Sequence, residues 1–258
     1  MQLHFKQLGQ GEPLVMLHGL FGSSDNWLGV ASRLAPNFHL FLLDLRNHGT
    51  SLHNDETNYS IMAADVAEFL ETQKLERVNI LGHSLGGKVA MQFALDFPAR
   101  VEKLIVVDIA PRQYSPEHEK IFKALLALDL KKFQTRTQIE DALASEIPDL
   151  VLRRFLLKNL KTPVSPSSSF TWKANLSGLF KNHQTIYEPI VSKTSFEGPA
   201  LFLRGGKSRY VSEADLPGIK NLFPKAKIET IDRAAHWVHA DAPEEFVRLI
   251  SSFLADSH

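Results

Sequence analysis

The sequence predicts an α/β fold built around a mostly parallel sheet. Short continuous apolar segments alternate with helical segments along residues 1–110, and the same alternation returns from residue 199 onward. Strands that are buried on both faces of a parallel sheet have continuous apolar sequences. Strand–helix–strand alternation also implies right-handed crossovers, which place helices on the faces of the sheet.

The predicted strands are rich in β-branched or large aliphatic residues: Leu14–Leu17, Leu40–Leu43, Val78–Leu81, Leu104–Val107, Ala200–Leu203 and Ile228–Ile231. The predicted helices lie between or after them: Trp27–Leu34, Ile61–Gln73, Gly86–Phe97, Glu213–Leu222 and Pro243–Leu254. The second of these helices places Met62, Val66 and Phe69 on one side, which is typical of an amphipathic helix. The proline that opens the last helix suits a first helical turn.

About 90 residues of another character separate the fourth strand from the fifth. They contain three segments with helical patterns, Phe122–Leu130, Gln138–Ser145 and Leu150–Leu160, and a Pro/Ser-rich break at Thr162–Ser169. Connections between strands and helices normally take only a few residues. We therefore predict a helical cap at 111–198, inserted into an otherwise continuous sheet domain formed by 1–110 and 199–258.

Composition excludes several classes of function. The 258 residues contain 29 Lys and Arg, 29 Asp and Glu, and no Cys, which rules out a thiol nucleophile and Cys-ligated zinc. Zero net charge provides no field to attract nucleic acid. The longest apolar run, Ala124–Leu128, is too short to span a membrane, and the first residues lack the apolar segment of a secretory signal. We expect a cytoplasmic monomer or homodimer that acts on a small molecule.

A nucleophile motif follows the third predicted strand. Gly82-His83-Ser84-Leu85-Gly86 lies between that strand and a helix, which is the setting that Gly-x-Ser-x-Gly needs. A serine hydroxyl is a weak nucleophile, so it must stand on a sharp turn within reach of a base. We therefore predict Ser84 as the nucleophile. The N–H of Leu85, at the start of the helix, would face a developing oxyanion.

A second oxyanion donor is predicted in the turn after the first strand. That strand runs into His18-Gly19-Leu20-Phe21-Gly22, whose glycines allow a tight backbone. The N–H of Leu20 is the predicted partner of Leu85, and Phe21 is the alternative. The expected role of His18 is that of a hydrogen-bonded scaffold residue.

Eleven histidines compete for the role of base. His236 lies between the last strand and the last helix, in a loop that emerges at the same carboxyl edge of the sheet as Ser84. This position also gives the chain order serine, acid, histidine. We predict His236 as the base and keep His239 as the weaker alternative, while His83 is expected to pack on the structure. No His-Glu-x-x-His or similar spacing is present, so we predict no metal and no cofactor.

These motifs together resemble the α/β-hydrolase superfamily over nearly the whole chain. In most of that superfamily the acid follows the penultimate strand, where this sequence has Ser208. A hydroxyl cannot hold a developing imidazolium as a buried carboxylate does. The acid must therefore come from elsewhere in the chain.

Asp108 is the predicted acid. It ends the strand Leu104–Val107, which we expect beside the strand that leads into Ser84. A carboxylate buried there needs a partner. Asp108-Ile109-Ala110-Pro111, with the segments 46–49 and 236–239, is similar to the YbfF-like esterases, in which the acid follows this same strand. The resemblance thus implies the acid that the geometry favours. Its rivals, Glu213, Asp215 and Asp232, are expected to be solvated or helix-capping.

For the remaining conspicuous side chains we predict a structural role or leave two roles open. Asp44, Arg46 and His48 are expected to brace loops. Aromatic and aliphatic residues are predicted to line an acyl pocket or else to form the core of the cap: Phe21, Phe122, Leu126, Phe155, Trp172, Tyr187 and Trp237. The basic residues Arg153, Arg154, Lys158 and Lys161 indicate either a solvated face or attraction for an anionic leaving group such as a coenzyme A thioester.

The sequence therefore predicts a serine hydrolase that cleaves short-to-medium acyl esters through an acyl-enzyme. Acyl-CoA thioesters are a variant of the same reaction. Carbon–carbon bond hydrolysis, lyase chemistry and perhydrolysis use the same scaffold and remain alternatives. A ligand-binding receptor that retains hydrolase architecture is the alternative from another class.

Overall fold

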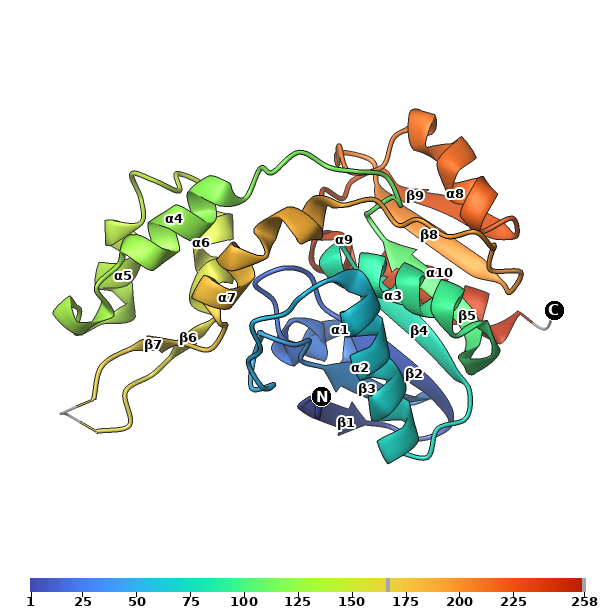
Figure 1. Ribbon diagram of the computed structural model, residues 1–258, viewed down its shortest axis with the longest axis horizontal. Coiled ribbons are helices and arrows are strands. Elements are labelled where there is room, and N and C mark those ends of the chain that lie inside the picture. The colour runs from blue at the N-terminus through green and yellow to red at the C-terminus, as the bar shows by residue number, and fades with distance from the viewer. Residues whose placement is uncertain (166–167, 257–258) are drawn as a thin grey trace.

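A computed structural model describes residues 1–165 and 168–256. Its main sheet has seven strands in the order β1-β3-β2-β4-β5-β8-β9 (Figure 1). Every neighbouring pair is parallel except β1 with β3. The strands are β1 (Phe5–Leu8), β2 (Glu12–Leu17), β3 (Phe38–Leu43), β4 (Val78–His83), β5 (Val101–Val107), β8 (Ala200–Gly205) and β9 (Ala226–Ile231). All six predicted strands are confirmed, whereas β1 was not predicted.

Helices cover both faces of this sheet. Alternate strand residues point to opposite faces, so Leu14 and Met16 pack with α1 and α10, while Val15 and Leu17 pack with α2 and α3. The helices of the core are α1 (Leu28–Leu34), α2 (Tyr59–Thr72), α3 (Leu85–Asp96), α8 (Leu216–Leu222), α9 (Val238–Asp241) and α10 (Pro243–Ala255), with short 3₁₀ turns η1 (Ser24–Trp27), η2 (Pro98–Arg100) and η5 (Glu213–Asp215). The mostly parallel sheet flanked by helices confirms the predicted fold class.

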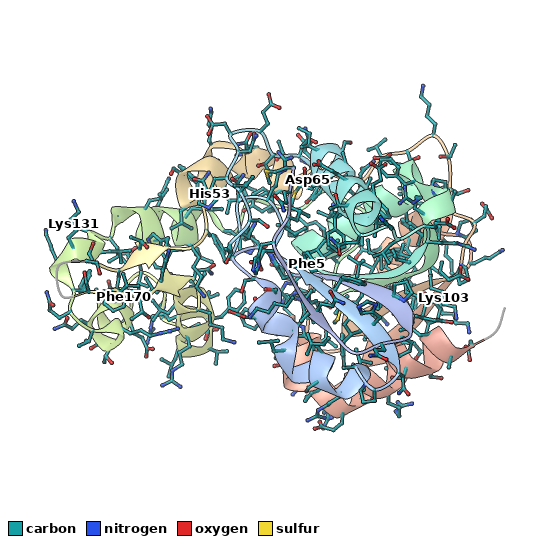
Figure 2. All side chains as sticks on the ribbon, turned by 90° about the horizontal axis from the view of Figure 1, so that it is seen from below. Phe5, His53, Asp65, Lys103, Lys131 and Phe170 are labelled. Atoms are coloured by element: carbon teal, nitrogen blue, oxygen red, sulfur yellow. The ribbon has the colours of Figure 1, made fainter. Side chains whose placement is uncertain are left out.

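The segment between β5 and β8 stands to one side of the sheet in both views (Figures 1 and 2). We call residues 111–198 the cap. It contains α4 (Glu119–Ala127), η3 (Leu130–Lys132), α5 (Arg136–Ala142), α6 (Leu150–Leu157), β6 (Leu160–Lys161), β7 (Thr171–Trp172), α7 (Leu176–Lys181) and η4 (His183–Tyr187). The three predicted cap helices are present.

Two features of the cap were not predicted. The predicted third helix stops early, because Leu160 and Lys161 form β6 and pair antiparallel with β7, and α7 follows this hairpin. The predicted Pro/Ser-rich break falls in the connection of the hairpin, and its residues Pro166 and Ser167 lie outside the described part of the chain. Across residues 1–165 and 168–256, every helix is too short or too polar to cross a membrane.

Two chain segments join the cap to the core and lie against each other. The N–H of Tyr114 donates to the carbonyl of Tyr187 at 2.9 Å, and the N–H of Ile190 donates to the carbonyl of Pro111 at 2.7 Å. We call these paired segments, residues 111–114 and 187–190, the neck. Because the neck leaves the sheet directly after Asp108, it brings cap residues close to the carboxyl edge of the strands.

Candidate active site

Ser84 occupies a strained turn between β4 and α3. Its φ of 52° and ψ of −116° lie in a region that non-glycine residues rarely adopt. Its N–H donates to the carbonyl of Val107 at 3.0 Å, which ties the turn to the neighbouring strand. The side chain is half-buried, so the hydroxyl stands at an accessible point of the carboxyl edge of the sheet.

Two glycines make this turn possible. A Cβ on Gly82 would lie 2.0 Å from the carbonyl oxygen of Gly86. A Cβ on Gly86 would lie 2.4 Å from the carbonyl oxygen of Leu17 in β2. The elbow therefore packs so closely on the sheet that neither position has room for a side chain.

Asp108 and His236 are in contact at the same edge. Asp108 follows β5, is 1 % exposed, and has a φ of 50°. Its Oδ2 lies 2.7 Å from Nδ1 of His236, and its Oδ1 accepts a hydrogen bond from the N–H of Gly205 at 2.9 Å. The hydroxyl of Ser208 donates to the same Oδ2. Ser208, which occupies the position where most of the superfamily has its acid, therefore binds Asp108, the acid predicted from the sequence.

The loop that carries His236 is held by two aromatic neighbours. The Tyr210 ring stacks on the His236 ring with centroids 3.9 Å apart. Nε2 of His83 donates to the main-chain carbonyl of His236 at 2.8 Å. Burial, with the nearby His236 adding to the effect, lowers the pKa of His83 well below its usual value, so this ring is neutral. His83 is therefore a structural residue, as the sequence predicted, while Tyr210 was not singled out.

The rival acids do not contact His236. Asp215 pairs with Arg112 at 2.8 Å and caps η5, and Glu213 pairs with Arg204. The carboxylate of Asp232 makes no hydrogen bond or ion pair within residues 1–165 and 168–256. Asp108 is therefore the carboxylate that the fold brings to the histidine.

His239 is placed differently from His236. Its ring is buried against Trp27, with centroids 4.6 Å apart, and its pKa is lowered to about 3 by burial and then by the nearby His236. Its Nδ1 has no hydrogen-bond partner among the described residues. It faces the interior, in agreement with the weaker role given to it.

The turn after β2 lies directly against Ser84. A Cβ on Gly19 would lie 3.4 Å from Cβ of Ser84. His18 fixes the turn, because its Nδ1 donates to the carbonyl of Gly19 at 2.8 Å while its Nε2 accepts from the N–H of Leu45 at 3.0 Å. His18 is thus the predicted scaffold residue.

The two residues predicted to supply oxyanion donors line the same hollow as Ser84. Leu20 lines the hollow beside Ser84, and its N–H has no acceptor within the described chain. The N–H of Leu85 is the first of α3 and has no acceptor within that helix. Phe21, the alternative donor, has a φ of 59°, and its carbonyl accepts from the side chain of Asn159 in the cap.

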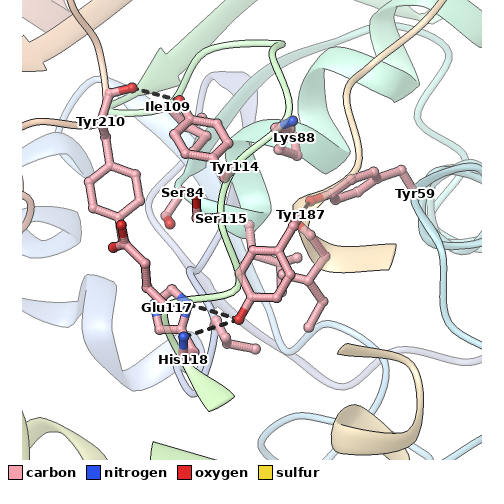
Figure 3. A pocket seen from close by; sticks show the side chains of 13 residues that line it. Tyr59, Ser84, Lys88, Ile109, Tyr114, Ser115, Glu117, His118, Tyr187 and Tyr210 are labelled. Atoms are coloured by element: carbon pink, nitrogen blue, oxygen red, sulfur yellow. Dashed lines mark hydrogen bonds between the residues drawn. The ribbon is translucent and has the colours of Figure 1, made fainter. Parts of the chain in front are cut away.

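The hollow that contains Ser84 is lined by four tyrosine rings together with aliphatic and polar side chains (Figure 3). We call it the acyl pocket. Several wall hydroxyls are bonded elsewhere: that of Tyr114 donates to the carbonyl of Tyr210 at 2.6 Å, and that of Tyr187 lies 3.2 Å from Nδ1 of His118. The lining residues are Leu20, Tyr59, Ser84, Leu85, Lys88, Ile109, Tyr114, Ser115, Glu117, His118, Ile186, Tyr187 and Tyr210.

Most of the aromatic residues predicted to line this pocket lie elsewhere. Phe122 is fully buried and packs against Phe21, with ring centroids 4.7 Å apart. The rings of Phe155 and Trp237 pack with centroids 5.4 Å apart, and both residues line a separate small cavity together with His83.

Trp172 belongs to β7, and Leu126 is 41 % exposed. Of the cap residues named from the sequence, Tyr187 does line the pocket. Apolar periodicity detects the core of the cap, whereas two of the tyrosines that line the pocket, Tyr114 and Tyr187, come from the neck.

The loop-bracing interpretation of Asp44, Arg46 and His48 is confirmed by their hydrogen bonds. Asp44 accepts from the N–H groups of Ser24 at 2.6 Å and Thr50 at 2.8 Å, and these bonds hold its pKa below the usual value against the opposing effect of burial. Arg46 forms a paired contact with Asp65 at 2.6 and 2.7 Å. His48 donates from Nδ1 to the carbonyl of Arg46 at 2.9 Å.

Within the described residues, three or more His, Cys, Asp or Glu side chains nowhere gather in a way that could hold a metal ion. Zinc, the metal most often bound by histidine, typically takes three or four such ligands. At the carboxyl edge His236 contacts the carboxylate of Asp108 and Ser84 stands on a nearby turn, while the described residues show no hydrogen bond between Ser84 and His236. This set can support nucleophilic attack by a serine.

A mostly parallel sheet, a strained serine elbow and a histidine–carboxylate contact define a class of protein. The profile of the family described as alpha/beta hydrolase fold matches residues 12–243, and the chain belongs to that family. Within the family it is of the YbfF-like type. It is 36 % identical to the esterase YbfF of Escherichia coli (strain K12) over 248 residues, covering 95 % of this chain and 93 % of that protein.

Two further relatives extend the comparison. The chain is 37 % identical over 252 residues to the sn-1-specific diacylglycerol lipase ABHD11 of Xenopus tropicalis, covering 95 % of this chain and 78 % of that protein. Among solved structures, an esterase from a marine microorganism superimposes with a TM-score of 0.94 at 43 % identity, covering 98 % and 99 % of the two chains.

Proposed function

We propose that the protein is a serine hydrolase that cleaves short-to-medium acyl carboxylic esters through an acyl-enzyme. The observation that carries this proposal is the contact between Asp108 and His236 beside the strained elbow of Ser84. Relatives that are named as esterases and as a diacylglycerol lipase support the same class of reaction.

In the proposed mechanism Ser84 attacks the ester carbonyl. His236 takes the proton from the hydroxyl through Nε2 and later delivers it to the leaving alcohol. Asp108 accepts from Nδ1 of His236, which fixes the ring orientation and stabilises the imidazolium that forms. Water then attacks the acyl group on Ser84 by the reverse sequence, releasing the acid and restoring the hydroxyl.

The oxyanion of each tetrahedral intermediate is proposed to bind the N–H groups of Leu20 and Leu85. Fixed donors of this kind stabilise charge that exists only in the transition state, and removing one typically costs about a hundredfold or more in rate. The closed turn at Gly19 and the start of α3 hold both donors without reorganisation. No metal or cofactor takes part in this mechanism.

The acyl group is proposed to lie in the acyl pocket and the leaving group beside His236. A lining of tyrosine rings with Leu20, Ile109 and Ile186 suits an apolar acyl chain. The cap, taken as a unit of residues 111–198, would cover this pocket through its neck. The same geometry also serves carbon–carbon bond hydrolysis, lyase and perhydrolase chemistry, and the ester reaction is preferred because the named relatives are ester hydrolases.

A thioester or another ester with an anionic leaving group is the second candidate substrate. A second hollow is lined by His236 together with three basic residues, Arg112, Lys207 and Arg209, and one acidic residue, Glu117. Lys207 and Arg209 are exposed and form no ion pair within the described chain. Because His236 protonates the leaving group, these two charges lie where an anionic leaving group would pass.

The basic residues of α6 contribute less to this second candidate. Arg153 donates to the carbonyls of Ile147 and Pro148 at 2.7 and 2.9 Å, and Arg154 lies 3.7 Å from the carboxylate of Glu140. These contacts favour the structural interpretation of that helix. The leaving-group preference is therefore assigned to Lys207 and Arg209.

The test is hydrolysis of a series of p-nitrophenyl esters from acetate to palmitate by the wild-type protein and by Ser84→Ala. We expect turnover that peaks at short to medium acyl length and is lost in Ser84→Ala. Absence of turnover, or turnover that survives in Ser84→Ala, would overturn the proposal. Tight binding of an acyl ester without turnover would favour the receptor alternative.

A further inference from the structure

Lys88 is a buried lysine next to the nucleophile. It lies in the first turn of α3, where its N–H donates to the carbonyl of Ser84 at 3.0 Å, and its side chain is among those that line the acyl pocket. The residue is 1 % exposed. Lysine is almost never fully buried unless its ammonium is paired, so the partners of Nζ need an explanation.

The ammonium of Lys88 binds main-chain carbonyls from both sides of the neck. Nζ donates to the carbonyl of Arg112 at 2.7 Å and to that of Glu188 at 2.8 Å, with a longer contact of 3.3 Å to Pro111. Burial, with the Arg112 charge adding to the effect, lowers the pKa of Lys88 to about 7. A neutral amine still has two N–H groups, enough for the two short bonds.

Two tyrosine rings complete the surroundings of this ammonium. The centroids of Tyr59 and Tyr114 lie 5.6 and 5.3 Å from Nζ, within the range of cation–π contacts. Both rings line the acyl pocket. The hydroxyl of Tyr59 also donates to the carbonyl of Ile186, next to the neck on the returning side.

The segments that Lys88 binds also carry the walls of the pocket. Tyr114 and Tyr187 belong to the neck and are bonded to each other through the main chain at 2.9 Å. A shift of the neck relative to α3 would move both rings relative to Ser84. One ammonium thus connects the helix of the nucleophile to the two segments that determine the width of the pocket.

We propose, resting on the proposed function, that Lys88 is a positioning residue that sets acyl-chain selectivity by tying both sides of the neck to the helix of Ser84. It contacts no reacting atom and acts through the main chain of residues 111, 112 and 188. Without its ammonium the neck separates from α3, and the walls of the pocket no longer discriminate between chain lengths. Nζ makes no hydrogen bond to Asp108, His236, Leu20 or Leu85, so we expect its loss to change the discrimination between acyl lengths more than the chemical step.

Lys103 offers a matched control. It is also buried, and its Nζ donates to three main-chain carbonyls, those of Phe253, Leu254 and Asp256 at 3.3, 2.7 and 2.7 Å. It lies on β5, on the side of the core away from the cap (Figure 2). Lys103→Met therefore removes the same kind of interaction as Lys88→Met without affecting the neck.

The experiment compares kcat and KM over the p-nitrophenyl ester series for the wild type, Lys88→Met and Lys103→Met. In Lys88→Met we expect the preference for the best acyl length over acetate to fall by about tenfold or more, and we expect this loss to come from KM more than from kcat. Both variants should lower the melting temperature, but Lys103→Met should keep the wild-type profile. An unchanged profile in Lys88→Met, or an equal change in Lys103→Met, would overturn the proposal.

A milder variant keeps the test decisive if Lys88→Met does not fold. Tyr59→Phe removes only the hydroxyl that donates to Ile186, and we expect a smaller loss of selectivity in the same direction. A wild-type profile in Tyr59→Phe would then count against the proposal. Failure of the proposed function is distinguishable, because it would remove ester hydrolysis from the wild type or leave it intact in Ser84→Ala.

Discussion

The hydroxyl of Ser208 donates to Oδ2 of Asp108, the carboxylate oxygen that lies 2.7 Å from Nδ1 of His236. Two strand ends therefore meet at one carboxylate: β5 supplies the acid, and the turn after β8 supplies a donor from the position where most of the superfamily has its acid.

The first prediction concerns which carboxylate supports the histidine. Asp108→Asn should lower kcat by up to about 10⁴-fold, because an amide cannot stabilise the imidazolium and favours the wrong tautomer. Asp215→Asn and Asp232→Asn should retain kcat within about threefold, since neither side chain contacts His236. Nearly full activity in Asp108→Asn would show that another group holds the ring.

The adjacency of Ser208 to Asp108 also predicts a rescue. In the double variant Asp108→Asn/Ser208→Asp, a carboxylate returns at the other strand end, and we expect kcat to recover by at least about tenfold over Asp108→Asn alone. Ser208→Ala in the wild-type background should cost roughly 10- to 150-fold, the value of one hydrogen bond to a charged group. No recovery in the double variant would mean that position 208 cannot support His236.

The second prediction concerns the packing of the elbow. Gly86→Ala would place a Cβ 2.4 Å from the carbonyl oxygen of Leu17, so it should reduce stability by roughly 1–3 kcal/mol or more and distort Ser84. Gly29 and Gly218 lie in helices with no atom within 4 Å of an added Cβ. Replacing either by Ala should raise stability by about 0.4–1 kcal/mol. Urea unfolding of the three variants checks this order, and a stable, active Gly86→Ala would contradict it.

The third prediction concerns acid stability. The pKa of His239 is lowered to about 3 in the folded protein, whereas it is about 6.5 in an unfolded chain. Between these values the unfolded chain binds a proton that the folded protein does not. The stability associated with His239 is therefore complete above pH 6.5 and is lost as the pH falls towards 3.

Replacing this histidine removes that dependence. In His239→Leu we expect the slope of unfolding free energy against pH between 4.5 and 6 to decrease by about 1.4 kcal/mol per pH unit. Urea unfolding at four pH values in this range gives both slopes. Parallel slopes for the wild type and the variant would show that His239 is protonated in the folded protein.

The fourth prediction concerns the leaving group. 4-Acetoxybenzoate and its methyl ester share one acyl group and one ring but differ in charge. In Lys207→Gln/Arg209→Gln, kcat/KM for the anionic ester should fall by roughly fivefold at low salt, because two charges beside His236 are lost. The neutral ester should be unaffected.

The α6 pair provides the matched control for this prediction. Arg153→Gln/Arg154→Gln removes the same number of charges from the cap, and the ratio of the two kcat/KM values should stay at the wild-type value. Equal losses in both double variants would indicate a general effect of protein charge. If the preference for the anionic ester fell only in Arg153→Gln/Arg154→Gln, the leaving-group site would be assigned to α6 instead.

The main sheet and the central residues of the site could be predicted because their signals are local in sequence. Strands buried on both faces must be continuously apolar, and the elbow at Ser84 needs its two glycines within five residues. β1 was not predicted, because an edge strand packs on fewer neighbours and the Phe-Lys-Gln-Leu sequence has little apolar pattern. The β6–β7 hairpin pairs only two residues on each side, too few to establish a period.

The acyl pocket could not be predicted because it depends on contacts between distant segments. Tyr114 and Tyr187 reach the pocket through the pairing of the neck, which no periodicity reveals. Phe122 has the stronger apolar pattern and therefore belongs to the core of the cap. Lys88 resembles an ordinary helix lysine in the sequence, and its role depends on carbonyls 24 and 100 residues away.

The most direct test of the central claim is the mass of the protein after reaction with an alkyl fluorophosphonate, followed by peptide mapping. We expect one phosphonyl group per chain, attached to Ser84. The labelling rate should fall strongly in Asp108→Asn and in His236→Ala, and it should stay at the wild-type value in Asp215→Asn. Labelling at another residue, or labelling of Ser84 at an unchanged rate in Asp108→Asn, would contradict the claim that Ser84, His236 and Asp108 act together.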